Sequence, residues 1–144
     1  MRRLSQDSKA KALKNAPLFD GLSRKELVEL ARRTEDIEIP EGKVLCKEGD
    51  IGKEFFVIVD GEASVTRKGK RVVARGPGDF FGEIALLEDI PRMATVTAKT
   101  PLRVLVLTGP DFRHLLDQSP NVERKVLRAL ARRLVELSGD PTLA

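Results

Sequence analysis

The sequence has no tryptophan and no tyrosine, and it has only one cysteine and one histidine among its 144 residues. Any aromatic side chain that covers a ligand must therefore be one of the six phenylalanines. Cys46 cannot form an intramolecular disulfide, which favours a reducing compartment, and we expect the protein to be cytoplasmic. His114 stands alone, and no cluster of His, Cys or carboxylate residues has the spacing of a metal site. We therefore predict no metal and no catalytic residue.

Long apolar runs are also absent. No stretch approaches the roughly 20 apolar residues that cross a bilayer, and residues 1–16 are charged without the apolar centre of a signal peptide. The formal net charge of +4 is too small for a nucleic-acid footprint. The length suits one domain with a core of its own. We predict a single domain over residues 1–144, with no membrane segment.

Three zones follow one another along the chain. Residues 1–33 favour helices, and Ser23 with Glu26 three positions later forms a capping box. Residues 34–108 contain short β-type runs between glycines and prolines, at 35–39, 44–46, 55–59, 63–66, 71–74, 95–98 and 102–107. Residues 109–138 return to a helical pattern. This order predicts a mainly β fold, an antiparallel β-barrel or jelly roll (β-roll) with N-terminal helices and C-terminal lid helices.

The segment around Glu83 carries the clearest chemistry. Gly82 permits a positive φ and close backbone approach, and residues 84–87 are predicted to begin a short helix whose free N–H groups suit an anion. Arg92 can hold the same anion with two parallel hydrogen bonds. Glu83 suits a ribose hydroxyl, because a carboxylate would repel phosphate. Alone, each residue fits a turn or a solvated charge, but together they favour a phosphorylated, ribose-bearing ligand. The glycine spacing excludes the dinucleotide fingerprint and the P-loop.

These residues also follow a longer pattern, Phe-Gly-Glu-x-Ala-Leu, a spacer, and Pro-Arg-x-Ala-Thr. The matching positions are Phe81, Gly82, Glu83, Ala85, Leu86, Pro91, Arg92, Ala94 and Thr95, and framework glycines match at Gly49, Gly52, Gly61 and Gly78. The segment 78–96 resembles the phosphate-binding cassette of the cyclic nucleotide-binding domain family. The resemblance extends over residues 18–137.

The resemblance implies a role for each part of the segment. Arg92 would bind the exocyclic phosphate of a 3′,5′-cyclic nucleotide, and Glu83 would accept from the ribose 2′-hydroxyl. The valines of the preceding strands would form an apolar wall near the base. The implied ligand-binding residues are Phe81, Gly82, Glu83, Ile84, Ala85, Arg92, Met93, Ala94, Val65, Val72 and Val73. Family members that prefer cGMP often carry threonine after the cassette arginine; Met93 has no hydroxyl, which favours cAMP over cGMP.

The C-terminal helix offers candidates for a lid over the base, namely Arg132, Arg133, Leu134 and Leu137. The apolar stripe of this helix either packs on its own barrel or pairs with a second copy as a homodimer. Intramolecular packing is slightly favoured, because a lid that moves needs an apolar surface of the barrel to pack against. Its basic run, from Arg124 to Arg133, is predicted to be an exposed face that could also dock a partner.

The favoured function is a non-enzymatic regulatory sensor that binds a cyclic nucleotide, with no cofactor, and passes occupancy through the C-terminal helix to an unknown effector. One alternative is a fragment of a cyclic-nucleotide-responsive transcription regulator, or of a kinase or channel regulatory region. Transcription regulators of this type continue past the C-terminal helix, so we expect no nucleic-acid binding by this chain alone. Another alternative is a ligand-free dimerisation or docking module.

Overall fold

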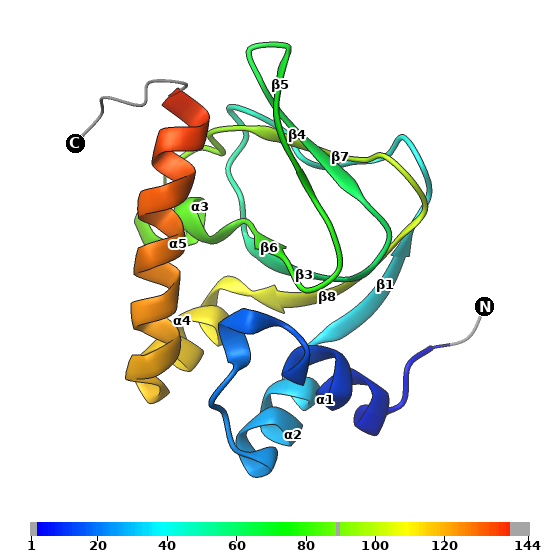
Figure 1. Ribbon diagram of the computed structural model, residues 1–144, viewed down its shortest axis with the longest axis vertical. Coiled ribbons are helices and arrows are strands. Elements are labelled where there is room, and N and C mark those ends of the chain that lie inside the picture. The colour runs from blue at the N-terminus through cyan, green and yellow to red at the C-terminus, as the bar shows by residue number, and fades with distance from the viewer. Residues whose placement is uncertain (1–2, 89, 139–144) are drawn as a thin grey trace.

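The computed structural model describes residues 3–88 and 90–138. The N-terminal helices are α1 (Gln6–Lys14), the 3-10 turn η1 (Pro17–Phe19) and α2 (Arg24–Arg33). The strands are β1 (Glu35–Ile39), β2 (Val44–Cys46), β3 (Glu54–Asp60), β4 (Ala63–Arg67), β5 (Lys70–Arg75), β6 (Phe80–Phe81), β7 (Thr95–Ala98) and β8 (Leu102–Thr108). Helix α3 (Glu83–Glu88) interrupts them, and α4 (Gly109–Gln118) and α5 (Pro120–Ser138) follow. In Figure 1, α5 runs along one side of the barrel, and α1 and α2 lie below it.

The strands form two four-stranded antiparallel sheets, ordered β1-β8-β3-β6 and β2-β7-β4-β5. The predicted mainly β fold with flanking helices is confirmed. Strands β4 and β5 form a hairpin, and Lys68 and Gly69 in its turn have positive φ. The predicted strand set lacked β6, whose two residues pair with Phe56 and Val57 of β3. So short a strand leaves no alternation to detect.

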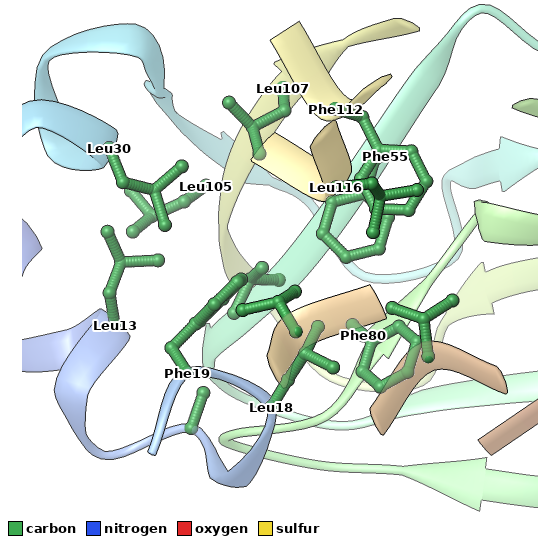
Figure 2. Packing of buried hydrophobic residues seen from close by; sticks show 14 of the residues in the cluster. Leu13, Leu18, Phe19, Leu30, Phe55, Phe80, Leu105, Leu107, Phe112 and Leu116 are labelled. Carbon is green, nitrogen blue, oxygen red and sulfur yellow. The ribbon is translucent and has the colours of Figure 1, made fainter. Parts of the chain in front are cut away.

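Strand β3 is buried on both faces, because one sheet lies between the helices and the second sheet. Phe55 and Val57 belong to the core on the helical side, and Phe56 and Ile58 belong to the core between the sheets. The Phe55 ring stacks on Phe112 of α4 with the centroids 4.3 Å apart. Figure 2 shows this helical side, where side chains from α1, η1 and α2 meet those of β8 and α4. This core fixes the helices against the sheet that carries β6.

Helix α2 begins where the sequence predicts. The Ser23 hydroxyl accepts from the Glu26 amide at 3.1 Å, and the Glu26 carboxylate accepts from the Ser23 amide at 2.9 Å. The apolar stripe of α5 divides between two faces: Val122 and Val126 are buried, whereas 60% of Leu127 is exposed. No helix in the described ranges is long and apolar enough to cross a membrane.

Candidate functional site

A cavity lies between the sheet of β4 and β5, the segment from β6 into α3, and helix α5. The predicted ligand-binding residues that line it are Phe81, Gly82, Glu83, Ile84, Arg92, Met93, Ala94, Val65, Val72 and Val73. The side chain of Ala85 lies outside the described part of the structure. The fold therefore brings residues from the two strands β4 and β5 and from the segment 81–94 to one place.

Of the lid candidates, Arg133 lines the cavity. Arg132 and Leu134 are exposed and are not among the residues that line it. The side chain of Leu137 is outside the described residues. Glu136 lines the cavity as well, and nothing in the sequence pattern pointed to it.

Arg92 is buried, with 8% of its surface exposed, and two backbone carbonyls hold its guanidinium. Its Nη1 donates to the Gly82 carbonyl at 2.9 Å, and its Nη2 donates to the Glu54 carbonyl at 2.8 Å. The side chain passes so close to Gly52 that a Cβ there would lie 2.0 Å from the Arg92 Nε. These two bonds use two of the five N–H groups of the guanidinium, which leaves three for a ligand.

The backbone around Arg92 is fixed to the loop that precedes β3. The Arg92 amide donates to the Asp50 carbonyl at 2.8 Å, and the Gly49 amide donates to the Arg92 carbonyl at 2.9 Å. Gly82 has a φ of 97°, and a Cβ there would lie 2.7 Å from the Glu54 carbonyl. A side chain at position 82 would therefore be strained and would displace the strand that holds Arg92.

Glu83 is almost fully buried, at 2% exposed, and it pairs with Arg133 of α5. The Arg133 Nη1 donates to Glu83 Oε1, and its Nη2 donates to the Phe80 carbonyl. The guanidinium carbon also lies 4.1 Å from the centroid of the Phe80 ring, in cation–π contact. Burial lowers the pKa of the Arg133 guanidinium, and the charge of Glu83 opposes that shift. The ion pair thus offsets part of the cost of burying the guanidinium.

A second ion pair joins α5 to the sheet. The Arg75 Nη2 at the end of β5 lies 3.0 Å from Glu136 Oε1, and both side chains are largely shielded from solvent. With α5 held by these contacts, the open volume of the cavity is about 70 Å³. Pockets that hold small ligands usually measure about 300–1,000 Å³. A nucleotide therefore has room only if side chains of α5 move away.

The remaining walls of the cavity are apolar. Val65 is buried, and Val72 and Val73 are half-buried beside it. Cys46 closes this side, and burial raises the pKa of its thiol to about 11, although the charge of Arg92 acts in the opposite direction. Among the described residues there is no group of three side chains able to hold a metal ion. The cavity thus combines an apolar wall, a guanidinium with free donors and a buried carboxylate.

The model of the cyclic nucleotide-binding domain family matches residues 36–119. The chain belongs to this family. The matched region contains both sheets and the whole cavity except its α5 side. The resemblance carried by the segment 78–96 is thereby confirmed for most of the chain.

Cyclic nucleotide-binding domains of similar sequence occur in different kinds of protein. The cAMP-dependent protein kinase regulatory subunit of Eremothecium gossypii is 44% identical over 105 residues, which are 72% of this chain and 23% of that protein. A cyclic nucleotide-gated potassium channel of Rhizobium etli is 38% identical over 118 residues, which are 81% of this chain and 33% of the channel. The matched region thus spans about a quarter to a third of these relatives.

Solved structures of cyclic nucleotide-binding domains share the fold. The cAMP-bound PfPKA-R superposes with a TM-score of 0.85 at 27% identity, covering 95% of this chain and 48% of that one. The catabolite activator protein of Thermus thermophilus superposes with a TM-score of 0.75 at 30% identity, covering 85% of this chain and 60% of that one. The β-roll with flanking helices is common to all of them.

Proposed function

We propose that this chain is a regulatory sensor that binds a 3′,5′-cyclic nucleotide, with cAMP preferred, and reports occupancy through a movement of α5. The observation that carries the proposal is the presence of Arg92, Glu83 and an apolar wall around one cavity. Support also comes from the similar proteins that are regulatory subunits of cAMP-dependent protein kinases, and from the similar PfPKA-R, which is cAMP-bound.

In this proposal the phosphate binds to Arg92. Two carbonyls already fix the direction of the guanidinium, so its remaining N–H groups are oriented before the ligand arrives. Amide groups at the start of α3, from Gly82 onward, add donors for the same anion. Each charge-assisted bond contributes about 1.5–3 kcal/mol.

Ribose and base occupy the rest of the cavity. The Glu83 carboxylate accepts from the 2′-hydroxyl, and Val65, Val72 and Val73 pack against the purine. Met93 lines the cavity where members of the family that prefer cGMP often carry a threonine. Because methionine offers no hydroxyl to guanine, adenine is the favoured base.

The signal follows from the competition for Glu83. A ribose hydroxyl that takes the carboxylate leaves Arg133 as a buried cation without its partner, and such a cation is more stable in water. Leaving the site moves the part of α5 that carries Arg133, which also opens the small cavity. Nucleotide binding and the observed position of α5 are thus alternatives, which gives the ligand the differential affinity that a switch requires.

The movement of α5 would be read by a partner protein, a fused domain or a second copy bound through the same helix. The similar regulatory subunits and channels are each larger than the matched region, so a partner or a further domain suits this role. We assign no catalytic activity to the chain, in keeping with the regulatory role by which those subunits are named. A free, buried cysteine suits a cytoplasmic location.

Calorimetric titration of the purified chain with cAMP and with cGMP tests the proposal. We expect cAMP to bind more tightly than cGMP, and we expect Arg92→Lys to weaken cAMP about tenfold to a hundredfold, because lysine keeps the charge but cannot make the paired bonds. Arg124→Lys, an exposed arginine of α5 away from the cavity, is the matched control and should bind normally. Met93→Thr should improve cGMP binding. The absence of heat with both nucleotides would refute the proposal.

A further inference from the structure

A second and larger space lies beside α5. It is a groove of about 650 Å³ between α5, the turn η1 and the chain from the end of β5 to β6. We call it the basic groove and define it by Pro17, Leu18, Phe80, Lys125, Arg128 and Arg132. Its volume is about nine times that of the cavity that holds Glu83, since the two measure about 650 and about 70 Å³. It is therefore open without any movement of α5.

The floor of the basic groove is apolar and its rim is cationic. Leu18, Phe80 and Ala129 are each less than a tenth exposed and form part of its surface. On the rim, Arg128 and Arg132 are exposed and make no hydrogen bond or ion pair with any residue in the described part of the chain. Two unpaired arginines thus stand over an apolar floor, one helical turn apart.

Two of the three carboxylates that line the groove already interact with other groups of the protein. Glu136 pairs with Arg75 at 3.0 Å, and the Asp79 carboxylate accepts from the Gly76 amide at 2.9 Å. Asp20 is exposed at the edge, where its backbone carbonyl accepts from Lys125. Five cationic side chains and three carboxylates line the groove, so its net charge is positive.

The basic groove and the cavity share part of their lining. Arg75, Arg133 and Glu136 line both spaces. Arg133 forms the ion pair with Glu83 that a ribose hydroxyl would have to break. The same Arg133 side chain also borders the groove that a partner would occupy. Two sites with a common wall of charged side chains are physically placed to influence each other.

We propose that the basic groove docks an acidic segment of a partner protein, with glutamate or aspartate side chains on Arg128 and Arg132 and apolar side chains on the floor. A nucleic-acid backbone fits less well, because its phosphates would leave the apolar floor of Leu18, Phe80 and Ala129 uncovered, whereas the apolar side chains of a peptide would pack on it. A second copy that presents the same face across a two-fold axis would place Arg128 and Arg132 against their own counterparts. Charge complementarity therefore selects an acidic peptide.

This docking rests on the proposed function in one respect, which is its dependence on nucleotide. When ribose takes Glu83, Arg133 becomes available to a partner carboxylate on the groove side. Nucleotide and acidic segment then favour each other, and the coupling is reciprocal. Couplings of this kind change affinity about 5- to 150-fold.

Fluorescence anisotropy with a labelled peptide of alternating glutamate and leucine tests the docking site, in the absence and in the presence of saturating cAMP. We expect the peptide to bind, and Arg128→Gln and Arg132→Gln each to weaken it about two- to fivefold. Arg124→Gln removes the same charge from the same helix outside the groove, and it should have no such effect. A peptide with lysine in place of glutamate should not bind.

The outcomes separate the two proposals when cAMP binding is measured independently by calorimetry. Peptide binding that depends on Arg128 in a protein that does not bind cAMP would support the groove and refute the sensor. Normal cAMP binding with no peptide binding, or with equal losses for Arg128→Gln and Arg124→Gln, would overturn the groove. Binding to phosphatidylserine vesicles in place of the peptide would also overturn it, because the occupant would then be a membrane surface.

Discussion

The ion pair between Glu83 and Arg133 should stabilise the fold more than an ordinary surface pair. The two side chains are only 3% and 11% exposed, and the guanidinium also contacts the Phe80 ring. Removing one partner of a buried pair usually costs about 3–5 kcal/mol of unfolding free energy. Because Glu83 lines a cavity that water can enter once Arg133 is gone, we expect about 1–3 kcal/mol for Arg133→Met.

A double-mutant cycle isolates the interaction itself. Urea unfolding, followed by far-ultraviolet circular dichroism, is measured for the wild type, Arg133→Met, Glu83→Gln and the double variant. The expected coupling free energy is about 1–3 kcal/mol, and each kcal/mol corresponds to about 4 °C in Tm for a domain of this size. The exposed pair Lys99 and Glu62, 3.4 Å apart, is the control and should show about 0.2–1 kcal/mol. Additivity of the first cycle within about 0.5 kcal/mol would refute the reasoning.

The same pair should also set the affinity for nucleotide. Since Arg133 and the ribose compete for one carboxylate, Arg133→Met should tighten cAMP binding by up to about tenfold. The measurement is a calorimetric titration of that variant. Weaker binding would mean that Arg133 covers the bound base instead of competing with the ribose.

Three further predictions concern other buried groups. Burial raises the pKa of Asp36, but the hydrogen bond and the charge of Arg103 lower it by more, so the net pKa is depressed. The ionised Asp36 therefore stabilises the fold above the unfolded-state pKa of about 4, and this contribution is lost as the pH falls through the lower folded-state pKa. Urea unfolding at neutral and acidic pH should therefore show a deficit for Asp36→Asn that disappears in acid. Alkylation of the Cys46 thiol should be about a hundredfold slower than in the unfolded chain, because a pKa raised from 9.0 to about 11 lowers the thiolate fraction by that factor; equal rates would contradict the burial. Gly52→Ala should abolish cAMP binding in calorimetry and should also lower Tm, because the new Cβ displaces the Arg92 guanidinium from the Gly82 and Glu54 carbonyls that hold it.

Much of the fold follows from local sequence. The strands alternate in burial or lie between glycines, and the capping box at Ser23 fixes the start of α2, so both could be predicted. Ten of the ligand-binding residues predicted from the sequence line the cavity, and seven of these ten lie in one segment, 81–94, whose glycine and arginine have few alternative uses together.

Other features depend on packing between distant segments. The contact between Glu83 and Arg133 spans 50 positions and requires the exact rotation of α5 on the barrel, which is set by Val122 and Val126. The Arg92 side chain packs against Gly52, which lies 40 positions earlier in the sequence. The sequence showed this glycine only as a match to the family pattern and not as a neighbour of Arg92. The basic groove combines η1, β6 and α5, which no sequence pattern relates.

The central claim is that cAMP takes Glu83 from Arg133 and thereby moves α5. The most direct measurement is the distance between spin labels on α5 and on the barrel, by pulsed electron resonance, with and without saturating cAMP. Leu134→Cys and Lys43→Cys, both exposed positions, carry the labels in a Cys46→Ala background. We expect cAMP to shift the main distance by several ångströms in this protein, and we expect the same shift to need about tenfold to a hundredfold more cAMP when Arg92→Lys is added. A distance distribution that stays the same while calorimetry shows cAMP bound would contradict the claim.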